Sequence, residues 1–500
     1  MKIKTDTLAG ITVALALFPE ALAFSILAGV PPMVGVTAVF VVGTITALFG
    51  GKPGMISGAA GAVAVGLGPL VKAYGLEYLF ATVVLAGMLQ LFFALCRLDR
   101  ILRFISLPVN WGFMNGLAVL IFVAQLSHFK TADPAGPQWL SSVPLGMKIG
   151  LTAASMLIMR YWSKLTNKLP GALVAIVGGA LIVWLFNLPA RTVGDMTAVE
   201  GRIPTFHIAN VPPNWETVVI IFPYALVMAG VGLIESLLTL DLIADRTGTQ
   251  GNGKREIVAQ GIANCLSGTT GGMGGCAMVG QSLINLEAGG RSRLSGIVAA
   301  LSFLILAVFG SFLIERVPLA SLTGVMFIIA FNTFNWKSIT QVRHYPVPEF
   351  LMLVLVTGIT IFTGNLALAV LIGIAVSLLG AKLKRYGSLI SLIRSDNADG
   401  QRYELHGDLF FANVHRLGSE LVNVRHSSDL TLDLRYGRIL DMTGARAVFD
   451  LARLFHQHGG RLQLIHIAED DIQLLCNTAR LFQTLNCAAL FKSDRQMGQE

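Results

Sequence analysis

Long apolar runs dominate this 500-residue chain and restrict it to the folds that a lipid bilayer permits. About fourteen of them lie between residues 8 and 383, separated by polar or charged breaks. Most are long enough to cross a hydrocarbon core of about 30 Å as a helix. The chain is 54% hydrophobic and only 13% charged. It is therefore predicted to be an α-helical, polytopic membrane protein.

Basic residues are distributed unevenly among the breaks between these runs. With the N-terminus inside, the inner breaks hold 19 Lys and Arg residues and the outer breaks hold 6, of 37 in the chain. This bias follows the positive-inside rule and predicts cytoplasmic N- and C-termini. The membrane is expected to be a bacterial inner (plasma) membrane. The bias also accounts for the net charge of +8, so no nucleic-acid partner is expected.

The runs form two halves of about seven each, at about residues 8–187 and 217–383. An odd number of crossings inverts the second half relative to the first, as in the inverted repeats of secondary transporters. The membrane domain is expected to occupy residues 1–385. Residues 386–500 are polar and mixed in charge, and strands at 430–434 and 461–467 around a helix at 443–456 predict a small cytoplasmic α/β domain.

Two glycine-rich stretches stand at corresponding places in the halves, GGKPGMISGAAGA at 50–62 and GGMGGCAMVGQS at 271–282. The apolar run after the first has about 13 residues, or roughly 20 Å of helix, which is too short to span. Each crossing is thus predicted to be part extended backbone and part short helix. Such interrupted segments indicate a transporter's substrate site, and the alternative is close helix packing through small residues.

Neither glycine-rich segment carries a basic side chain within its helical run. An anion could be met there by backbone N–H groups and by the positive ends of two helices. The hydroxyls of Ser57 and Ser282 could add donors. A sequence that fits P-loop spacing, GTQGNGK at 248–254, has Arg255 where a magnesium-binding hydroxyl is required. No nucleotide site and no enzymatic activity are therefore expected.

Carboxylates within the spans are candidates for function because burying them is costly. Glu20 follows Pro19 in the first run, and Glu235 and Thr239 are four residues apart on one helix face. Glu235 with Thr239 could hold a sodium ion, or either carboxylate could take a proton. The alternative is a structural carboxylate bonded to the glycine-rich backbone. Five cysteines show no paired or metal-type spacing, so neither a disulfide framework nor a zinc site is expected.

Several motifs resemble the SulP anion permease family: LFPEALAFSILAGVPP, ALFGGKPGMISGAAGAVAV, IESLLTLDLIAD and GQGIANCLSGTTGGMGGCAMVGQSLIN. The resemblance implies a seven-plus-seven inverted repeat whose core and gate domains move as an elevator. It also implies a homodimer and a C-terminal STAS domain, which could bind a cytoplasmic partner. Thr443 matches a position near the phosphorylatable serine of that domain, which makes it a candidate regulatory residue.

The resemblance also assigns residues to the substrate anion, which in the family lies between the facing ends of the third and tenth helices. Glu20 matches the polar residue of the first helix, and Glu235 with Thr239 matches a sodium-binding aspartate and threonine of the bicarbonate branch. The arginine that several animal members carry at the start of the tenth helix has no counterpart here. The matching substrate residues are Ser57, Gly58, Ala59, Ala60 and Gly61, and Cys276, Ala277, Met278, Val279, Gln281 and Ser282.

Together these features predict a secondary active transporter for a small oxyanion, either sulfate, bicarbonate or a dicarboxylate. Its coupling ion would be sodium or a proton, and no other cofactor is expected. Three alternatives stay open at this point: a nucleobase permease of the same fold, an uncoupled anion channel, and a membrane-anchored signalling scaffold.

Overall fold

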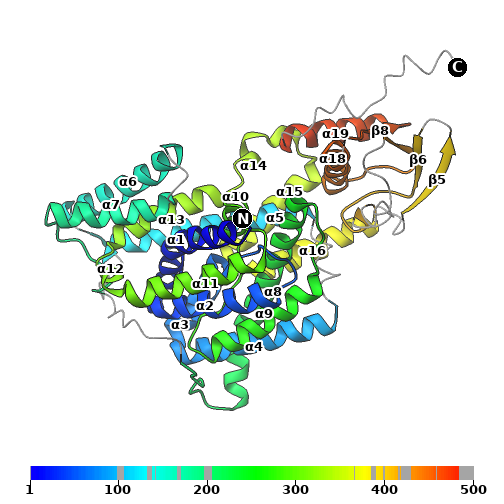
Figure 1. The fold of residues 1–500 in the computed structure, drawn as a ribbon. Helices are drawn as coiled ribbons and strands as arrows, with labels where there is room; N and C mark the ends of the chain where they lie inside the picture. Colours follow the sequence, from blue (N-terminus) through cyan, green and yellow to red (C-terminus); the bar gives the residue numbers. More distant parts are fainter. Residues whose placement is uncertain are drawn as a thin grey trace. The chain divides into compact units, whose positions relative to one another are not determined.

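A computed structural model gives the fold of this protein (Figure 1). The chain divides into two compact units whose segments are interleaved along the sequence. The first comprises Met1–Leu102, Gly116–Phe334 and Ile359–Leu368, and the second Arg103–Asn115, Asn335–Gly358 and Ala369–Glu500. The described residues are 2–97, 106–131, 138–140, 142–165, 170–195, 205–364, 366–383, 390–397, 400–414, 417, 429–457 and 459–482.

Helices of the first unit lie where the apolar runs predict them. Its early helices are α1 (Lys2–Ala28), α2 (Pro32–Phe49), α3 (Gly61–Tyr74), α4 (Leu76–Leu95), α6 (Ser142–Leu165) and α7 (Gly171–Leu185). Its later helices are α8 (Trp215–Thr247), α9 (Gly253–Gly268), α10 (Val279–Glu287), α11 (Arg293–Phe309), α12 (Ser311–Glu315) and α13 (Leu319–Thr333). Three helices contribute residues to both units: α5 (Leu107–Leu126), α15 (Val347–Thr363) and α16 (Leu366–Leu383).

The apolar helices fall into two length classes. Among the described residues, five segments are long and apolar enough to cross a membrane: Ile3–Ala28, Pro32–Phe49, Leu76–Leu95, Leu107–Phe129 and Trp215–Ala244. Six other apolar helices have 10–17 residues, and α3 is one of them. A helix of α3's 14 residues covers only about 21 Å. The extended residues before it therefore complete that segment's path.

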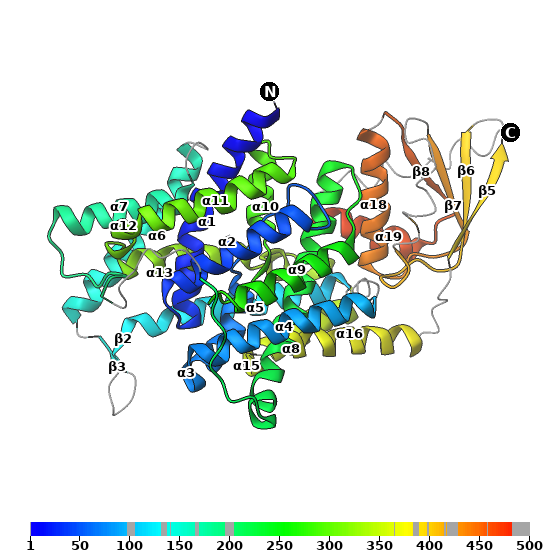
Figure 2. The ribbon, with the colours of Figure 1, turned by 60° about the horizontal axis from the view of Figure 1, so that its bottom comes forward.

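Four helices from the two halves of the sequence lie side by side in the first unit, in the order α11, α2, α9, α4 (Figures 1 and 2). Helix α1 packs along α11, and α8 packs along α4. In the same way, α1 contacts both α3 and α10, and α8 contacts both α10 and α3. Helices α6, α7 and α13 pack against one another. The halves are thus interleaved rather than stacked as separate bodies.

Small residues allow these helices to approach closely. On α4, a Cβ added at Gly87 would lie 2.6 Å from the Gly261 carbonyl oxygen of α9. Conversely, a Cβ at Gly261 would lie 3.0 Å from the Gly87 carbonyl oxygen. Only glycine permits backbones this close, which is the usual way for helices to associate in lipid. Helix α9, which leads into the second glycine-rich stretch, is thereby packed directly against α4.

In the second unit, residues 390–482 form a small α/β domain. Its sheet has the order β5 (Ser391–Asn397), β6 (Gly400–His406), β7 (Leu430–Tyr436) and β8 (Leu462–Ile465). Strand β5 runs antiparallel to β6, and the β6–β7 and β7–β8 pairs are parallel. The helices are α18 (Met442–Gln457) and α19 (Glu469–Phe482). The strand–helix–strand order predicted at 430–467 is confirmed as β7, α18 and β8.

The core of this α/β domain explains why β7 is the strand most evident in the sequence. Leu430, Leu432 and Leu434 of β7 are all buried, and so are Phe449 and Phe455 of α18. These leucines alternate with Thr431 and Asp433, so they line one face of the strand, which packs on the core. One expectation about the cysteines is wrong, because Cys476 on α19 is disulfide-bonded.

Candidate functional site

The two glycine-rich stretches meet in the middle of the first unit as a pair of very short strands. Strand β1 (Ser57–Gly58) runs antiparallel to β4 (Cys276–Ala277), with Ser57 opposite Ala277 and Gly58 opposite Cys276. Helix α3 begins at Gly61 and α10 at Val279. Because the strands are antiparallel, the helices start at opposite ends of the pair and run away from each other. Their N-terminal ends therefore face the same small region.

Glycine is required at the point where the two strands approach. A Cβ at Gly275 would lie 2.0 Å from the carbonyl oxygen of Gly58, a distance that no side chain tolerates. Gly274 has a φ of 70°, in the left-handed region that glycine adopts without strain. The glycine-rich composition thus has a local cause, which is the crossing of two backbones in contact.

Both short helices begin without a side-chain cap. The residues at the cap positions, Ala60 and Met278, make no capping hydrogen bond. The first bonds within these helices run from Ala64 N–H to Ala60 and from Ser282 N–H to Met278. The N–H groups before Ala64 and Ser282 have no intrahelical acceptor, and a helix N-terminus carries roughly half a positive charge. Together these ends provide a place for an anion without any cationic side chain.

Open space lies at the start of α10 and not at the start of α3. Gly280, in the first turn of α10, is exposed, and no atom lies within 4 Å of the position that its Cβ would take. At Gly61 of α3, a Cβ would lie 2.8 Å from the Phe24 ring. Gly280 is not among the residues that the sequence motifs assign to the site. The only indication of its role in the sequence is its position between Val279 and Gln281, which are both predicted substrate residues.

Two half-buried carboxylates contact the segment that contains β4 and the start of α10. The Cys276 thiol donates a hydrogen bond to Glu235 Oε2 on α8, with an Sγ–Oε2 distance of 2.8 Å. The Gln281 side chain hydrogen-bonds the carboxylate of Glu20 on α1. The structure therefore brings Glu20 and Glu235 to the same short segment from two sides.

Thr239 lies one turn beyond Glu235 on α8. Its hydroxyl donates to the Glu235 backbone carbonyl oxygen at 2.7 Å, so the lone pairs of Oγ1 remain available to a cation. Oxygen ligands of this kind suit a hard cation such as sodium. Among the described residues, no group of three or more His, Cys, Asp or Glu side chains could hold a metal ion. A cation here would need backbone carbonyl oxygens as well.

The two hydroxyls predicted to donate to an anion each accept a hydrogen bond within the protein. Ser282 Oγ accepts a hydrogen bond from Ile56 N–H at 3.0 Å and so joins α10 to the residue before β1. Ser57 Oγ accepts from Gln260 Nε2 at 3.0 Å, and the same nitrogen donates to Glu256 Oε1 at 3.0 Å. Ser282 therefore joins α10 to the backbone before β1, and Ser57 joins β1 to the Gln260 side chain of α9.

Strand β4 is fixed by groups on α8 and α9 that the sequence analysis did not assign to the site. Asn264 accepts from Gly275 N–H at 2.9 Å through Oδ1 and donates to the Gly275 carbonyl oxygen at 3.1 Å through Nδ2. Ser236 Oγ accepts from Ala277 N–H at 3.1 Å. These buried bonds satisfy both backbone groups of Gly275, just before β4, and the N–H group of Ala277 within it, and so fix the position of the strand.

The turn that leads into β1 is fixed by basic side chains at the end of α2. Arg293 donates to the carbonyl oxygens of Ala47, Leu48 and Gly50, and Arg255 Nε donates to that of Phe49 at 2.8 Å. Cations at a helix C-terminus satisfy its free carbonyls and its negative dipole end. These arginines therefore serve the fold of the loop before β1.

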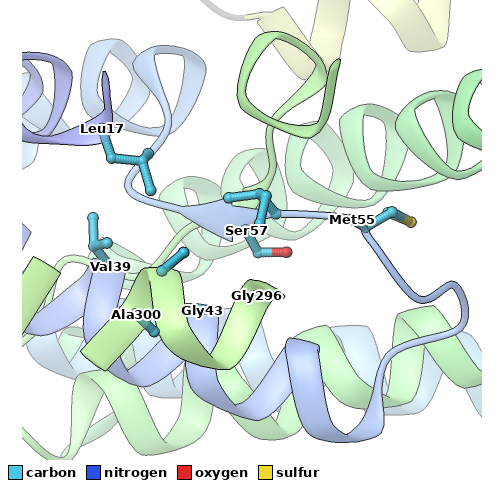
Figure 3. A pocket seen from close by; sticks show the side chains of 9 residues that line it. Leu17, Val39, Gly43, Met55, Ser57, Gly296 and Ala300 are labelled. Carbon is cyan, nitrogen blue, oxygen red and sulfur yellow. The ribbon is translucent and has the colours of Figure 1, made fainter. Parts of the chain in front are cut away.

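A small pocket lies behind Ser57, on the side of β1 that faces α2 and α11 (Figure 3). Its lining is apolar or small and includes Leu17, Val39, Met55 and Gly296. It contains about 210 Å³ of space between atoms, none of it wide enough for a water molecule. Because it contains neither Glu20 nor Glu235 and offers little polar surface, it does not suit an anion.

The remaining predicted residues of the two segments line the strand pair. Ala59, Ala60 and Ala277 are buried, and Met278 N–H donates to the Ile56 carbonyl oxygen at 2.9 Å. Val279 is half-buried beside Gly280. The small side chains keep the backbone of both segments close to the region where the helices begin.

Thr443 lies in the second unit, at a packed contact. Its hydroxyl accepts from Leu107 N–H at the start of α5, at 3.2 Å. The adjacent Met442 is fully buried with Leu353, and its N–H donates to Glu349 Oε1 on α15 at 2.9 Å. A regulatory role for Thr443 remains a prediction.

Comparisons with known sequences agree on one family. The sequence model of the sulfate permease family matches residues 3–357. The protein named "Putative sulfate transporter YbaR" of Bacillus subtilis (strain 168) is 37% identical over 462 residues, covering 92% of this chain and 94% of that protein. The bicarbonate transporter BicA of Picosynechococcus sp. is 28% identical over 400 residues, covering 75% of this chain and 69% of that protein.

Solved structures show the same fold. The transmembrane domain of a cyanobacterial bicarbonate transporter BicA has a TM-score of 0.64 and 27% identity, covering 76% of this chain and 98% of that chain. The murine Slc26a9 anion transporter has a TM-score of 0.67 and covers 98% of this chain and 89% of that chain. Its identity is 16%, so that likeness concerns the fold alone.

Proposed function

We propose a substrate class and a coupling mechanism for this chain, which belongs to the sulfate permease family. Proteins of this family are membrane anion transporters rather than enzymes, and this chain is a multi-pass membrane protein of that kind. The proposal is that it moves a small oxyanion, sulfate or bicarbonate, across the bacterial inner membrane by secondary active transport. Two observations support this choice of substrates: the motifs resemble those of the family, and the relatives are named as sulfate or bicarbonate transporters.

The observation that carries the proposal is the open space at Gly280 beside two uncapped helix N-termini. An oxyanion there would accept hydrogen bonds from backbone N–H groups at the start of α10 and α3. Binding through helix ends and backbone donors alone gives moderate affinity, which a transporter needs for release. Small oxyanions differ little in these requirements, so the geometry favours neither sulfate nor bicarbonate.

Coupling to a cation is the second part of the proposal. Glu235 and Thr239 would supply oxygen ligands to sodium, and Glu20 would exchange a proton. Both carboxylates contact the same segment as the anion, so an ion bound at either one could change how that segment binds the anion. The proposed cation sites at Glu235 and Glu20 are thus linked to the proposed anion site by direct contacts with Cys276 and Gln281.

The architecture implied by the family is proposed for this chain as well. The contacts of the two halves support an inverted repeat, because they exchange consistently: α1 packs on α11 as α8 packs on α4, and α2 on α11 as α9 on α4. From the family resemblance we further propose about fourteen crossings, a moving core and a gate, and a STAS domain at residues 386–500. A homodimer with cytoplasmic termini completes the proposal.

Uptake into proteoliposomes tests the substrate and the coupling. The full chain would be reconstituted and supplied with radiolabelled sulfate or bicarbonate under a sodium gradient and, separately, a pH gradient. We expect saturable uptake of at least one anion, driven by one of the gradients. Linear flux that follows only the membrane potential would identify a channel, and uptake of uracil without either anion would identify a nucleobase permease.

One substitution tests the site itself. Gly280→Leu would place a side chain in the open space at the start of α10, and uptake should fall by about tenfold or more because the anion loses access to the backbone donors. Gly150→Leu on α6 is a matched control, because its Cβ also meets no atom within 4 Å. Equal uptake by both variants would contradict the placement of the site.

A further inference from the structure

Two consecutive residues of strand β4 form hydrogen bonds with two consecutive residues of α8. Cys276 donates through its thiol to Glu235 Oε2 at 2.8 Å, and Ala277 donates through its backbone to Ser236 Oγ at 3.1 Å. Cys276 is fully buried, and Gly58 of β1 lies opposite it in the strand pair. A single side chain, the thiol, therefore joins the α8 carboxylate to the strand that leads into the candidate anion site.

This thiol fixes a carboxylate that would otherwise be free to reorient. A glutamate has three side-chain torsions, and the last of them is broad and weakly restricted. The hydrogen bond to Oε2 selects one orientation and leaves Oε1 for another ligand. A bond to a charged acceptor is also stronger than a thiol's usual weak donation. Cys276 thus provides the anchor that the long arm of Glu235 requires.

We propose that Cys276 is a positioning residue that links sodium at Glu235 to the anion at the start of α10. This inference rests on the proposed transport function. A sodium ion on the Glu235 carboxylate competes for the electron density that the S–H group uses, so the bond weakens and β4 can adjust. Cys276 is two residues before Met278, the cap position of α10, so an adjustment of β4 alters the anion site directly. Thermodynamic linkage then requires that the anion change the affinity for sodium by the same factor.

The alternative is that Cys276 only fills space between β4 and α8. Serine and alanine distinguish the two roles, because serine retains a donor and alanine removes it while both reduce the volume. If the donor matters, Cys276→Ser should resemble the wild type and Cys276→Ala should not. If only packing matters, the two variants should behave alike.

The first test measures how sodium changes the KM for anion uptake by the full chain in proteoliposomes. The ratio of KM in choline chloride to KM in sodium chloride would be determined for sulfate and for bicarbonate. We expect a ratio of about 5 or more in the wild type, a ratio near 1 in Cys276→Ala, and most of the wild-type ratio in Cys276→Ser. An unchanged ratio in Cys276→Ala, or an equal loss in both variants, would overturn the inference.

The second test needs no transport activity. The S–H stretch of Cys276 would be isolated by infrared difference spectroscopy between the wild type and Cys276→Ser. Glu235→Gln replaces the charged acceptor with a weaker one, so this band should move to higher frequency, and sodium should move it the same way in the wild type. The band of Cys265, whose thiol donates to the Val84 carbonyl oxygen at 3.6 Å, serves as the control and should stay in place.

The two tests separate failure of this inference from failure of the proposed function. A wild type that takes up neither anion would overturn the transport proposal, and a shifted S–H band would then identify the Cys276–Glu235 pair as a structural contact only. A wild type with sodium-dependent uptake but no band shift in Glu235→Gln would leave the transport proposal in place and overturn the role of Cys276.

Discussion

Segments β1–α3 and β4–α10 meet at one strand pair, but they are surrounded by different chemistry. Around the first, a Cβ at Gly61 would contact the Phe24 ring and a Cβ at Gly58 would contact Val39. Around the second, Asn264 and Ser236 bond the backbone. The backbone of the first segment at Gly58 and Gly61 therefore packs against apolar side chains, whereas side chains hydrogen-bond the backbone of the second at Gly275 and Ala277.

The carboxylates follow the same division. Glu235 accepts from Cys276 of β4, and Glu20 is bonded to Gln281 of α10. Their partners are thus both on the second segment. A helix start that must bind an anion and respond to a cation needs polar contacts that change with occupancy. Apolar contacts do not change in that way. We therefore assign anion recognition to both segments, and the response to the coupling cation, here called ion control, to β4–α10.

The largest difference between the segments is expected for an added methyl group at the strand pair. Gly275→Ala would place its Cβ 2.0 Å from a backbone oxygen of Gly58, and neither strand can move aside cheaply. Overpacking of this kind costs about 1–3 kcal/mol or more. We expect little folded protein and no uptake, measured by size-exclusion chromatography and by proteoliposome assay.

Gly58→Ala is the matched substitution on the first segment. Its Cβ would lie 3.3 Å from Val39 Cγ2, which can shift slightly, and in ordinary contact with the Met278 sulfur at 3.6 Å and Val39 Cα at 3.7 Å. This variant should fold and retain most of its uptake. Equal damage from both substitutions would show that the two strands are constrained alike and would break the comparison.

Removing the charge from each carboxylate should change ion dependence and leave the fold intact. Glu235→Gln should remove the dependence of uptake on sodium, because an amide binds a cation weakly. Glu20→Gln should instead flatten the dependence of uptake on pH. Coupling factors are typically about 5- to 150-fold, so the losses should be large in uptake assays under each gradient. If both variants keep the wild-type response to both gradients, the carboxylates are structural and ion control lies elsewhere.

Local signals in the sequence predicted much of this arrangement. Hydropathy located the helices, and the two glycine-rich stretches located the interrupted segments, because both signals depend on nearby residues only. The leucines that alternate with polar residues at 430–434 identified β7 for the same reason. Strands β5 and β6 lack such an alternation of leucines, so they were not predicted.

Contacts between distant residues could not be predicted in this way. Ile56 bonds Ser282 across 226 positions, and Cys276 meets Glu235 across 41, because two backbones cross at the strand pair. Nothing in either segment alone specifies the register of that crossing. The open space at Gly280 likewise depends on where α1 and α8 pass, and a glycine in a glycine-rich motif gives no sign of it.

A smaller difference is expected for the two serines. Ser282→Ala removes the acceptor of the buried Ile56 N–H group, and an unsatisfied buried donor costs about 1–3 kcal/mol. Ser57→Ala removes an acceptor from Gln260, whose Nε2 still donates to Glu256, so about 0.5–1.5 kcal/mol is expected. Thermal unfolding of the two purified variants would give the order, and a greater loss in Ser57→Ala would contradict it.

The smallest effect on uptake is expected for a carboxylate outside the strand pair. Asp433 of β7 has a buried side chain, and it accepts from Arg402 at 2.5 Å and His466 at 2.9 Å. Burial alone would raise its pKa, but these hydrogen bonds and one from Arg435 N–H hold the pKa below its ordinary value of 3.8. A carboxyl group whose pKa is lowered by folding stabilises the protein above the unfolded pKa, and this contribution is lost as the pH falls through the folded pKa.

Asp433 is therefore fully charged throughout the neutral range and cannot contribute to a pH response of uptake between about pH 5 and pH 8. Asp433→Asn should leave the shape of the uptake–pH profile unchanged, even where lower stability reduces the amount of protein. It should also make proteolysis within residues 430–436 less dependent on pH between about pH 5 and pH 3, because the charge-dependent contribution is gone. A displaced uptake profile in Asp433→Asn would show that the α/β domain takes part in ion control. In that case ion control could no longer be assigned to β4–α10 alone.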